Sequence, residues 1–181
     1  EATAVVPEGR ITHADLGIWK DEHVEKLKQI VSFIHENGAI AGIQLAHAGR
    51  KASCDLPWNG GEQLTEGENS WQTVGPSPIP FKKDQVAPHE LSISEIQDIV
   101  FAFRAAAKRA LDAGYKVIEV HAAHGYLLHE FFSPLSNTRS DVYGGSFENR
   151  IRLVIDVVEA VQSVWPENLP VFVRISATDW T

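Results

Sequence analysis

The pattern of apolar and polar positions marks out three short, mostly apolar segments, at residues 39–45, 116–121 and 170–175. Each contains valine or isoleucine and lacks the regular polar alternation of a half-exposed strand. Short apolar runs of this kind are typical of parallel strands that are covered on both faces. We therefore predict three buried strands at these positions.

The segments between these strands show helical periodicity together with capping signals. A first helix is predicted over residues 21–36, and a third over about 147–164. Ser92 and Glu95 form a capping box for the second helix, which Gly114 ends. The apolar positions expected to face the core are Val24, Leu27, Val31 and Ile34 in the first helix, Ile96, Ile99, Val100, Phe103 and Ala107 in the second, and Ile151, Val154, Val158 and Val161 in the third.

Helices and strands therefore alternate along the chain, which indicates right-handed βαβ units around a parallel sheet, an α/β fold. The loops that follow the strands are long, at about residues 46–91 and 122–145, whereas the loops that precede them are short. Barrel enzymes build their sites from long loops at the carboxyl ends of the strands. A doubly wound open sheet also binds ligands at that edge, so topology alone leaves both architectures open.

Composition and charge exclude several classes of function. The 181 residues are 44% hydrophobic and 22% charged, as expected of one globular domain. The formal net charge of −8 argues against a nucleic-acid partner, because phosphate binding needs a basic face. There is no apolar run of membrane-spanning length, and the single cysteine, Cys54, fits a reducing compartment. We expect a cytoplasmic protein with no membrane or nucleic-acid partner.

Polar side chains occur near the carboxyl ends of all three predicted strands, at Gln44, His121 and Arg174. Each has an ordinary explanation by itself: a hydrogen bond to a loop, a satisfied core histidine, or an ion pair. Because the carboxyl ends of parallel strands meet at one edge of the sheet, three such residues together indicate a shared ligand.

The segment His121-Ala122-Ala123-His124-Gly125-Tyr126 is the most informative for chemistry. Two imidazoles three residues apart can direct N–H groups at one carbonyl oxygen and stabilise negative charge on it. The Tyr126 phenol can deliver a proton nearby. A metal site is the alternative, and it needs a third ligand such as His129 or Glu130. A purely structural role for both histidines also remains open.

Several segments resemble the Old Yellow Enzyme family of flavin-dependent oxidoreductases. Residues 1–5 are similar to the end of that family's second barrel strand, and residues 43–51 to its third strand and the loop that follows. Residues 117–127 are similar to the fourth strand, and residues 173–177 to the fifth. The segments that carry the resemblance read EATAV, IQLAHAGRK, VIEVHAAHGYL and VRISA, together with the loop SPLSNTRSDVYGGS and ENR at residues 133–150.

The resemblance implies residues 1–181 to be a partial FMN-binding (β/α)8 TIM-barrel domain, from the end of strand 2 through strand 5. The chain begins at Glu1, has no methionine and ends at Thr181, and we expect a piece of a longer protein that also contains the first strand and the C-terminal strands. A pair of histidines in the substrate motif implies the bacterial, thermophilic-like subclass.

The resemblance also implies roles for individual residues. Gln44, Arg174 and the backbone of Ala2 are expected to contact FMN, with Gln44 at the pyrimidine edge of the flavin and Arg174 at its N1/O2 side. His121 and His124 are expected to bind the substrate carbonyl, and Tyr126 to protonate the carbon next to it.

The implied activity is that of an ene-reductase. NAD(P)H reduces FMN, which then reduces the C=C bond of an α,β-unsaturated carbonyl compound, with no metal. The parent is expected to be a homo-oligomer.

Two alternatives are kept. One is a multi-domain enzyme similar to dienoyl-CoA reductases, with an iron–sulfur cluster outside this chain. The other is a catalytically silent barrel fragment that serves for binding or assembly. Asn137, Arg139 and Asp141 are expected to hold a long loop in place by hydrogen bonds and to have no catalytic role. Cys54 is not expected to take the role of the family's flavin-tuning cysteine, which belongs to the first strand.

Overall fold

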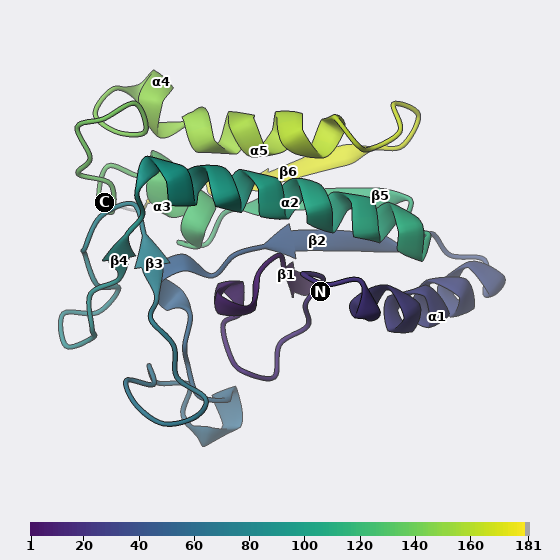
Figure 1. Cartoon of the computed structure of the whole chain (residues 1–181), viewed down its shortest axis with the longest axis horizontal. Helices are drawn as coiled ribbons and strands as arrows, with labels where there is room; N and C mark the ends of the chain where they lie inside the picture. The colour runs from purple at the N-terminus through teal and green to yellow at the C-terminus, as the bar shows by residue number, and fades with distance from the viewer. Residues whose placement is uncertain (180–181) are drawn as a thin grey trace.

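The computed structural model describes residues 1–179 and contains a main sheet of four parallel strands (Figure 1). Their order across the sheet is β1 (Ala2–Ala4), β2 (Gly42–Ala46), β5 (Val117–Ala122) and β6 (Val171–Ile175). Every neighbouring pair is parallel, as the alternation of helices and strands predicted. A separate parallel pair, β3 (Val74–Gly75) with β4 (His89–Glu90), lies within the long loop after β2.

Three longer helices connect the strands: α1 (Glu22–Glu36), α2 (Ile93–Ala113) and α5 (Arg152–Gln162). In Figure 1, α2 and α5 run side by side along one face of the sheet, and the long loops gather at the carboxyl ends of the strands. The short elements in and around these loops are η1 (Pro7–Gly9), η2 (Gly49–Lys51), η3 (Pro57–Asn59), α3 (Leu127–Phe132) and α4 (Phe147–Arg150).

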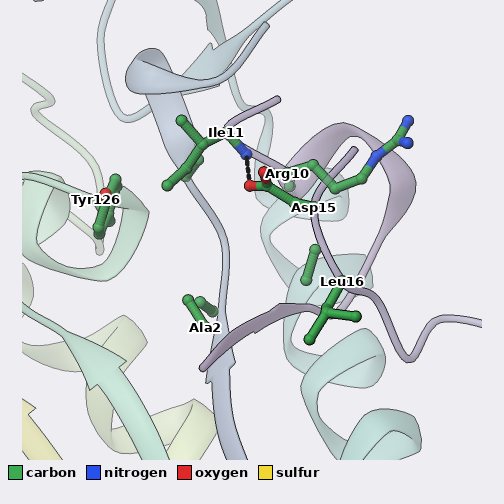
Figure 2. Close-up of a pocket in the computed structure, with 10 residues that line it drawn as sticks. Ala2, Arg10, Ile11, Asp15, Leu16 and Tyr126 are labelled. Carbon is green, nitrogen blue, oxygen red and sulfur yellow. Dashed lines mark hydrogen bonds between the residues drawn. The ribbon is translucent and has the colours of Figure 1, made fainter. Parts of the chain in front are cut away.

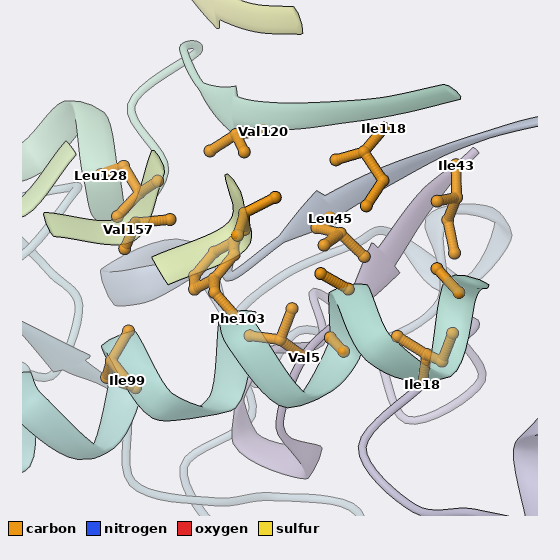
Figure 3. Close-up of a cluster of buried hydrophobic side chains, with 14 of the residues drawn as sticks. Val5, Ile18, Ile43, Leu45, Ile99, Phe103, Ile118, Val120, Leu128 and Val157 are labelled. Carbon is orange, nitrogen blue, oxygen red and sulfur yellow. The ribbon is translucent and has the colours of Figure 1, made fainter. Parts of the chain in front are cut away.

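The hydrophobic core lies between the sheet and this helical layer (Figure 3). Alternate residues of β2 and β5 point toward the helices, and Phe103 of α2 is fully buried among them. The sheet contributes Ile43, Leu45, Ile118 and Val120, all at most 4% exposed. Each large apolar side chain buried in this way stabilises the fold by about 1.5–3 kcal/mol. The opposite face of the sheet is therefore left for other groups.

The predicted limits of the second helix are confirmed. The Ser92 side chain accepts a hydrogen bond from the Glu95 backbone, and the Glu95 carboxylate accepts one from the Ser92 backbone. Gly114 ends the helix with a φ of +96°, a conformation that a residue with a Cβ adopts only at a cost. All five predicted core positions of this helix are buried.

The third predicted helix differs from the prediction in two respects. It is divided at Ile151 into α4 and α5, because Asn149 and Arg150 donate side-chain hydrogen bonds to carbonyls of the preceding loop and tie the first turn to it. The buried stripe consists of Leu153, Val157 and Val161, so of the four expected inward positions only Val161 is fully buried.

The strands also differ slightly from their predicted limits, since β2 begins at Gly42 and Ile40 is exposed. Helix α3 and the β3–β4 pair were not predicted, because their segments are too short to show a periodic pattern. Within residues 1–179, no helix combines the length and apolar character that crossing a bilayer requires.

Candidate active site

The strand register brings the predicted polar residues to the face of the sheet that α2 does not cover. Ala2 of β1 is paired with Gln44 of β2, and Gln44 with Glu119 of β5. Two residues nearer the carboxyl end of β5, His121 is paired with Arg174 of β6. Residues paired in register point to the same side of a sheet. The predicted convergence of Gln44, His121 and Arg174 at one edge is therefore confirmed.

Gln44 and Arg174 have very different surroundings. The Gln44 side-chain Nε2 donates a hydrogen bond of 2.5 Å to Glu119 Oε1, which holds the amide in place on the sheet face. The Arg174 side chain is exposed, and it has no hydrogen bond or ion pair to any part of the chain that the structure describes. Its five N–H donors are thus available to a ligand.

Small side chains leave room beside this edge. A cavity there is lined by Ala2 and Ala4 of β1, by Ala46 and Ala48, and by Tyr126 on its other side (Figure 2). The far wall is the loop that follows β1, where Ile11 donates its backbone N–H to Asp15 Oδ2 at 2.8 Å. Alanine at four of the lining positions keeps the side chains at these strand ends small.

His121, His124 and Tyr126 lie together at the end of β5. The ring centroids of His121 and His124 are 5.0 Å apart with an interplanar angle of 81°, and those of His121 and Tyr126 are 5.2 Å apart at 74°. The predicted clustering of these three residues is confirmed. Their roles toward a ligand remain predictions.

A sharp backbone turn produces this arrangement. His124 has a φ of +60° and Gly125 of +71°, so two successive residues are left-handed. The turn is held by the His124 backbone N–H, which donates to Ser176 Oγ at 2.9 Å. A non-glycine residue in this conformation is strained by about 1–3 kcal/mol, and such strain is concentrated at functional sites. The turn brings His124 back toward the ring of His121.

Burial sets the protonation state of two of these groups. Desolvation, with His124 and Arg174 adding to it, lowers the pKa of His121 to about 4, so this imidazole is neutral at pH 7. Its Nδ1 atom is buried and has no hydrogen-bond partner. Burial also raises the pKa of Tyr126, with a smaller contribution from the negative charge of Asp15, so the phenol keeps its proton. Both side chains are therefore able to donate a hydrogen bond.

The structure does not gather a third metal ligand beside the histidine pair. His129 accepts a hydrogen bond from the Gly125 backbone and contacts Asp179 at 3.1 Å, while Glu130 accepts one from the Arg50 backbone at 3.0 Å. Within residues 1–179 no three His, Cys, Asp or Glu side chains form a group suited to a metal ion.

The loop after α3 is held as predicted. Asn137 donates to the carbonyls of Phe131 and Tyr143, and Arg139 donates to those of Pro76 and Leu91 and forms an ion pair with Asp141 at 2.6 Å. Arg150, in contrast, donates to two backbone carbonyls and has no acidic partner in the described part of the chain.

Lys51 is a neighbour of the site that we did not single out from the sequence. Its Nζ donates to the His124 carbonyl at 3.0 Å and lies 4.9 Å from the centre of the Tyr126 ring. Its position in a long loop directly after a strand was the available signal, but the sequence does not show which way a loop lysine points.

Comparisons with known proteins agree with this geometry. The sequence model of the NADH:flavin oxidoreductase / NADH oxidase family matches residues 1–181. The NADH:flavin oxidoreductase FG08077 of Gibberella zeae is 49% identical over 184 residues, which cover 99% of this chain and 45% of that protein.

Solved structures of the family superpose on nearly the whole chain. Morphinone reductase has a TM-score of 0.81 and 33% identity, over 97% of this chain and 48% of its own. The old yellow enzyme homologue from Zymomonas mobilis has a TM-score of 0.81 and 32% identity, over 97% of this chain and 48% of its own. The Old Yellow Enzyme from Pichia sp. AKU4542 has a TM-score of 0.83 and 30% identity, over 97% of this chain and 45% of its own.

The chain thus spans about half the length of these relatives. Both the predicted resemblance and the predicted fold class, part of a TIM barrel, are confirmed. The chain belongs to the NADH:flavin oxidoreductase / NADH oxidase family, the family of the Old Yellow Enzymes.

Proposed function

We propose that the protein containing this chain is an FMN-dependent NAD(P)H oxidoreductase that reduces the C=C bond of α,β-unsaturated carbonyl compounds. The observation that carries the proposal is the group formed by His121, His124 and Tyr126 at the carboxyl edge of the sheet. Family membership supports the flavin and the nicotinamide reductant. One solved relative, morphinone reductase, is described in complex with tetrahydroNAD.

The residues at this edge fit a flavin. A flavin ring is flat and carries hydrogen-bonding groups along its pyrimidine edge, and the Gln44 amide and the unpaired Arg174 guanidinium are suited to them. The alanines of β1 and β2 leave the strand ends uncrowded, and Ala2 presents its backbone beside Gln44. When bound, FMN accepts hydride from the nicotinamide and passes it to the acceptor.

The protein's own contribution is orientation and charge stabilisation. His121 is neutral, and together with His124 it donates N–H groups to the acceptor carbonyl, which draws electron density away from the C=C bond. The Tyr126 phenol keeps its proton at neutral pH and delivers it to the carbon next to the carbonyl. A neutral histidine at this position leaves no positive charge buried between turnovers.

The test uses the full-length protein that contains this chain, loaded with FMN, and follows the two half-reactions separately. His121→Ala and His124→Ala are expected to slow reoxidation of the flavin by an enone by about 100-fold or more, the usual range for a removed oxyanion donor. Reduction of the flavin by NAD(P)H is expected to change much less. Tyr126→Phe removes the proton donor and is expected to slow the enone step by about 100- to 10,000-fold.

The matched control is His89→Ala. The His89 side chain is exposed, and within residues 1–179 its hydrogen-bond partner is Glu95 at the surface, so its removal is expected to leave both half-reactions at the wild-type rate. If the His121 and His124 variants also reduce enones at the wild-type rate, the proposed mechanism is wrong. A full-length protein that binds no flavin would refute the proposed function itself.

Gln44→Ala and Arg174→Ala test the cofactor site. A hydrogen bond from the charged Arg174 guanidinium is worth about 1.5–3 kcal/mol and a neutral one from Gln44 about 0.5–1.5 kcal/mol. Arg174→Ala is therefore expected to bind FMN more than ten times more weakly, and Gln44→Ala several times more weakly. Flavin fluorescence titration measures this directly, and unchanged affinity in both variants would contradict the assignment. A homo-oligomeric parent, a cytoplasmic location and the bacterial subclass stay predictions.

A further inference from the structure

Arg50 and Lys51 of η2 are two adjacent cations without a carboxylate partner. Within residues 1–179, neither side chain forms an ion pair. The Arg50 guanidinium donates to the carbonyls of Ile79 and Pro80, and Lys51 to that of His124. In a protein with a formal net charge of −8, two neighbouring cations bound only by neutral groups are unexpected.

Aromatic rings hold these cations in place. The Lys51 ammonium lies 4.7 Å from the centre of the Phe81 ring and 4.9 Å from that of Tyr126. The Arg50 guanidinium lies 5.9 Å from the centre of the same Phe81 ring. The face of an aromatic ring attracts a cation but carries no net charge. These contacts therefore position the two charges and do not neutralise them.

The acidic groups nearby are engaged elsewhere. Glu130 is fully buried, and desolvation raises its pKa to about 8, so its carboxyl group is mostly uncharged at pH 7. Asp179 is bound by His129 and Ser133. Asp55 accepts from the Leu56 backbone and from Asn59. None of the three acts as a salt-bridge partner of Arg50 or Lys51.

Both cations line two cavities that adjoin the candidate site. One has a volume of about 310 Å³ and includes Tyr126 in its wall. The other has a volume of about 430 Å³ and includes His124. The Arg50 Nε atom is buried and has no hydrogen-bond partner, and burial lowers the pKa of Lys51. Buried and half-buried charges in proteins are normally paired, and no carboxylate of residues 1–179 pairs with these two, so the site is suited to a bound anion.

We propose that Arg50 and Lys51 form an anion subsite that binds a carboxylate or phosphate of the molecule whose reacting end lies at His121 and His124. Lys51 has three N–H donors, of which the His124 carbonyl takes one, so two remain for an anion. The contact of Lys51 with both His124 and Tyr126 places the subsite directly beside the reacting group. The inference rests on the proposed function and adds a substrate class to it: acceptors or reductants with an anionic group.

The anion has two chemical sources, and two experiments on the full-length, FMN-loaded protein distinguish them. For the acceptor, the second-order rate constant of flavin reoxidation is measured with 4-oxopent-2-enoate and with its methyl ester. The acid-to-ester ratio in Lys51→Met is divided by that in the wild type, which cancels the intrinsic reactivity of the two compounds. We expect the ratio to fall by about 10- to 100-fold in the variant.

For the reductant, single-turnover reduction of the flavin is measured against the concentrations of NADPH and NADH. A rise of about tenfold or more in the apparent Kd of either reductant in Lys51→Met assigns the subsite to a nicotinamide phosphate. A direct measurement without turnover uses levulinate and methyl levulinate, which contain no C=C bond. Calorimetric titration of the oxidised protein is expected to show that Lys51→Met weakens binding of the acid and not of the ester.

Two further variants keep the test decisive. Lys51→Arg retains the charge and is expected to restore most of the wild-type ratio, which a merely structural role of the lysine stem would not predict. Lys83→Met removes the same charge from an exposed position that lines neither cavity, and it is expected to leave the ratio unchanged. If Lys51→Met changes neither the acid-to-ester ratio, the reductant affinity nor levulinate binding, the anion subsite does not exist. In that case normal reduction of the neutral ester would leave the proposed function intact.

Discussion

Glu130 offers a sharp test of the electrostatics around the site. Its carboxyl group has no exposed surface, Oε1 accepts the Arg50 backbone N–H, and Oε2 has no partner. Burial raises the pKa of this carboxyl from the ordinary 4.5 to about 8, although Arg50 and Lys51 oppose the change. We therefore predict that Glu130→Gln removes a pH-dependent loss of stability.

The sign and size follow from linkage. Between pH 4.5 and pH 8 the folded state keeps the Glu130 proton and the unfolded state has lost it, so the free energy of unfolding falls as pH rises. The stabilising contribution is complete below the unfolded pKa of 4.5 and is lost as pH approaches about 8. The difference of the two pKa values corresponds to about 5 kcal/mol in full, and to about 3 kcal/mol by pH 7.

Glutamine preserves the acceptor for the Arg50 N–H and does not titrate. The free energy of unfolding of Glu130→Gln minus that of the wild type is therefore expected to increase by about 3 kcal/mol from pH 4.5 to pH 7. Groups that titrate equally in both proteins cancel in this difference. Denaturant unfolding of the full-length protein at a series of pH values measures it.

Glu66→Gln is the matched control, because Glu66 is exposed and loses the same charge on substitution. The free energy of unfolding of Glu66→Gln minus that of the wild type is expected to stay constant over the same pH range. If the free energy of unfolding of Glu130→Gln minus that of the wild type is also constant with pH, Glu130 is ionised in the folded protein. Arg50 and Lys51 would then have a counter-ion within the chain, contrary to the reasoning above.

Three further predictions concern the framework of the site. Arg139→Ala removes the ion-pair partner of Asp141 and the donor to two buried carbonyls, so it is expected to lower the free energy of unfolding by about 3–5 kcal/mol, measured by denaturant unfolding. Ser92→Ala removes the N-cap of α2 and is expected to cost about 1 kcal/mol in the same assay, whereas Ser94→Ala should cost less. The 181-residue chain produced by itself is expected to self-associate on gel filtration and to hold FMN weakly, because within residues 1–179 the outer edge of β6 is unpaired and Phe172 and Ile175 are exposed. A monomeric chain with tightly bound flavin would contradict this last prediction.

The long elements could be predicted from the sequence because their signals are local. The capping box of Ser92 and Glu95 and the left-handed stop at Gly114 involve residues close in the chain, and the structure shows both. The apolar stripe of α2 spans enough turns for its direction to be read reliably. The third helix misled us because the loop contacts of Asn149 and Arg150 divide it, and the stripe that packs on the core is the one centred on Val157.

The sequence by itself determined which residue types stand at the ends of the strands, and hence that Gln44, His121 and Arg174 would meet at one edge. It did so because parallel pairing and the period of two along a strand leave little freedom of placement. Only the tertiary structure decided that Lys51 reaches His124 and Tyr126, and that Glu130 is buried against the Arg50 backbone. These positions depend on how long loops from different strands pack together, and no local periodicity encodes contacts between residues more than seventy positions apart in the chain.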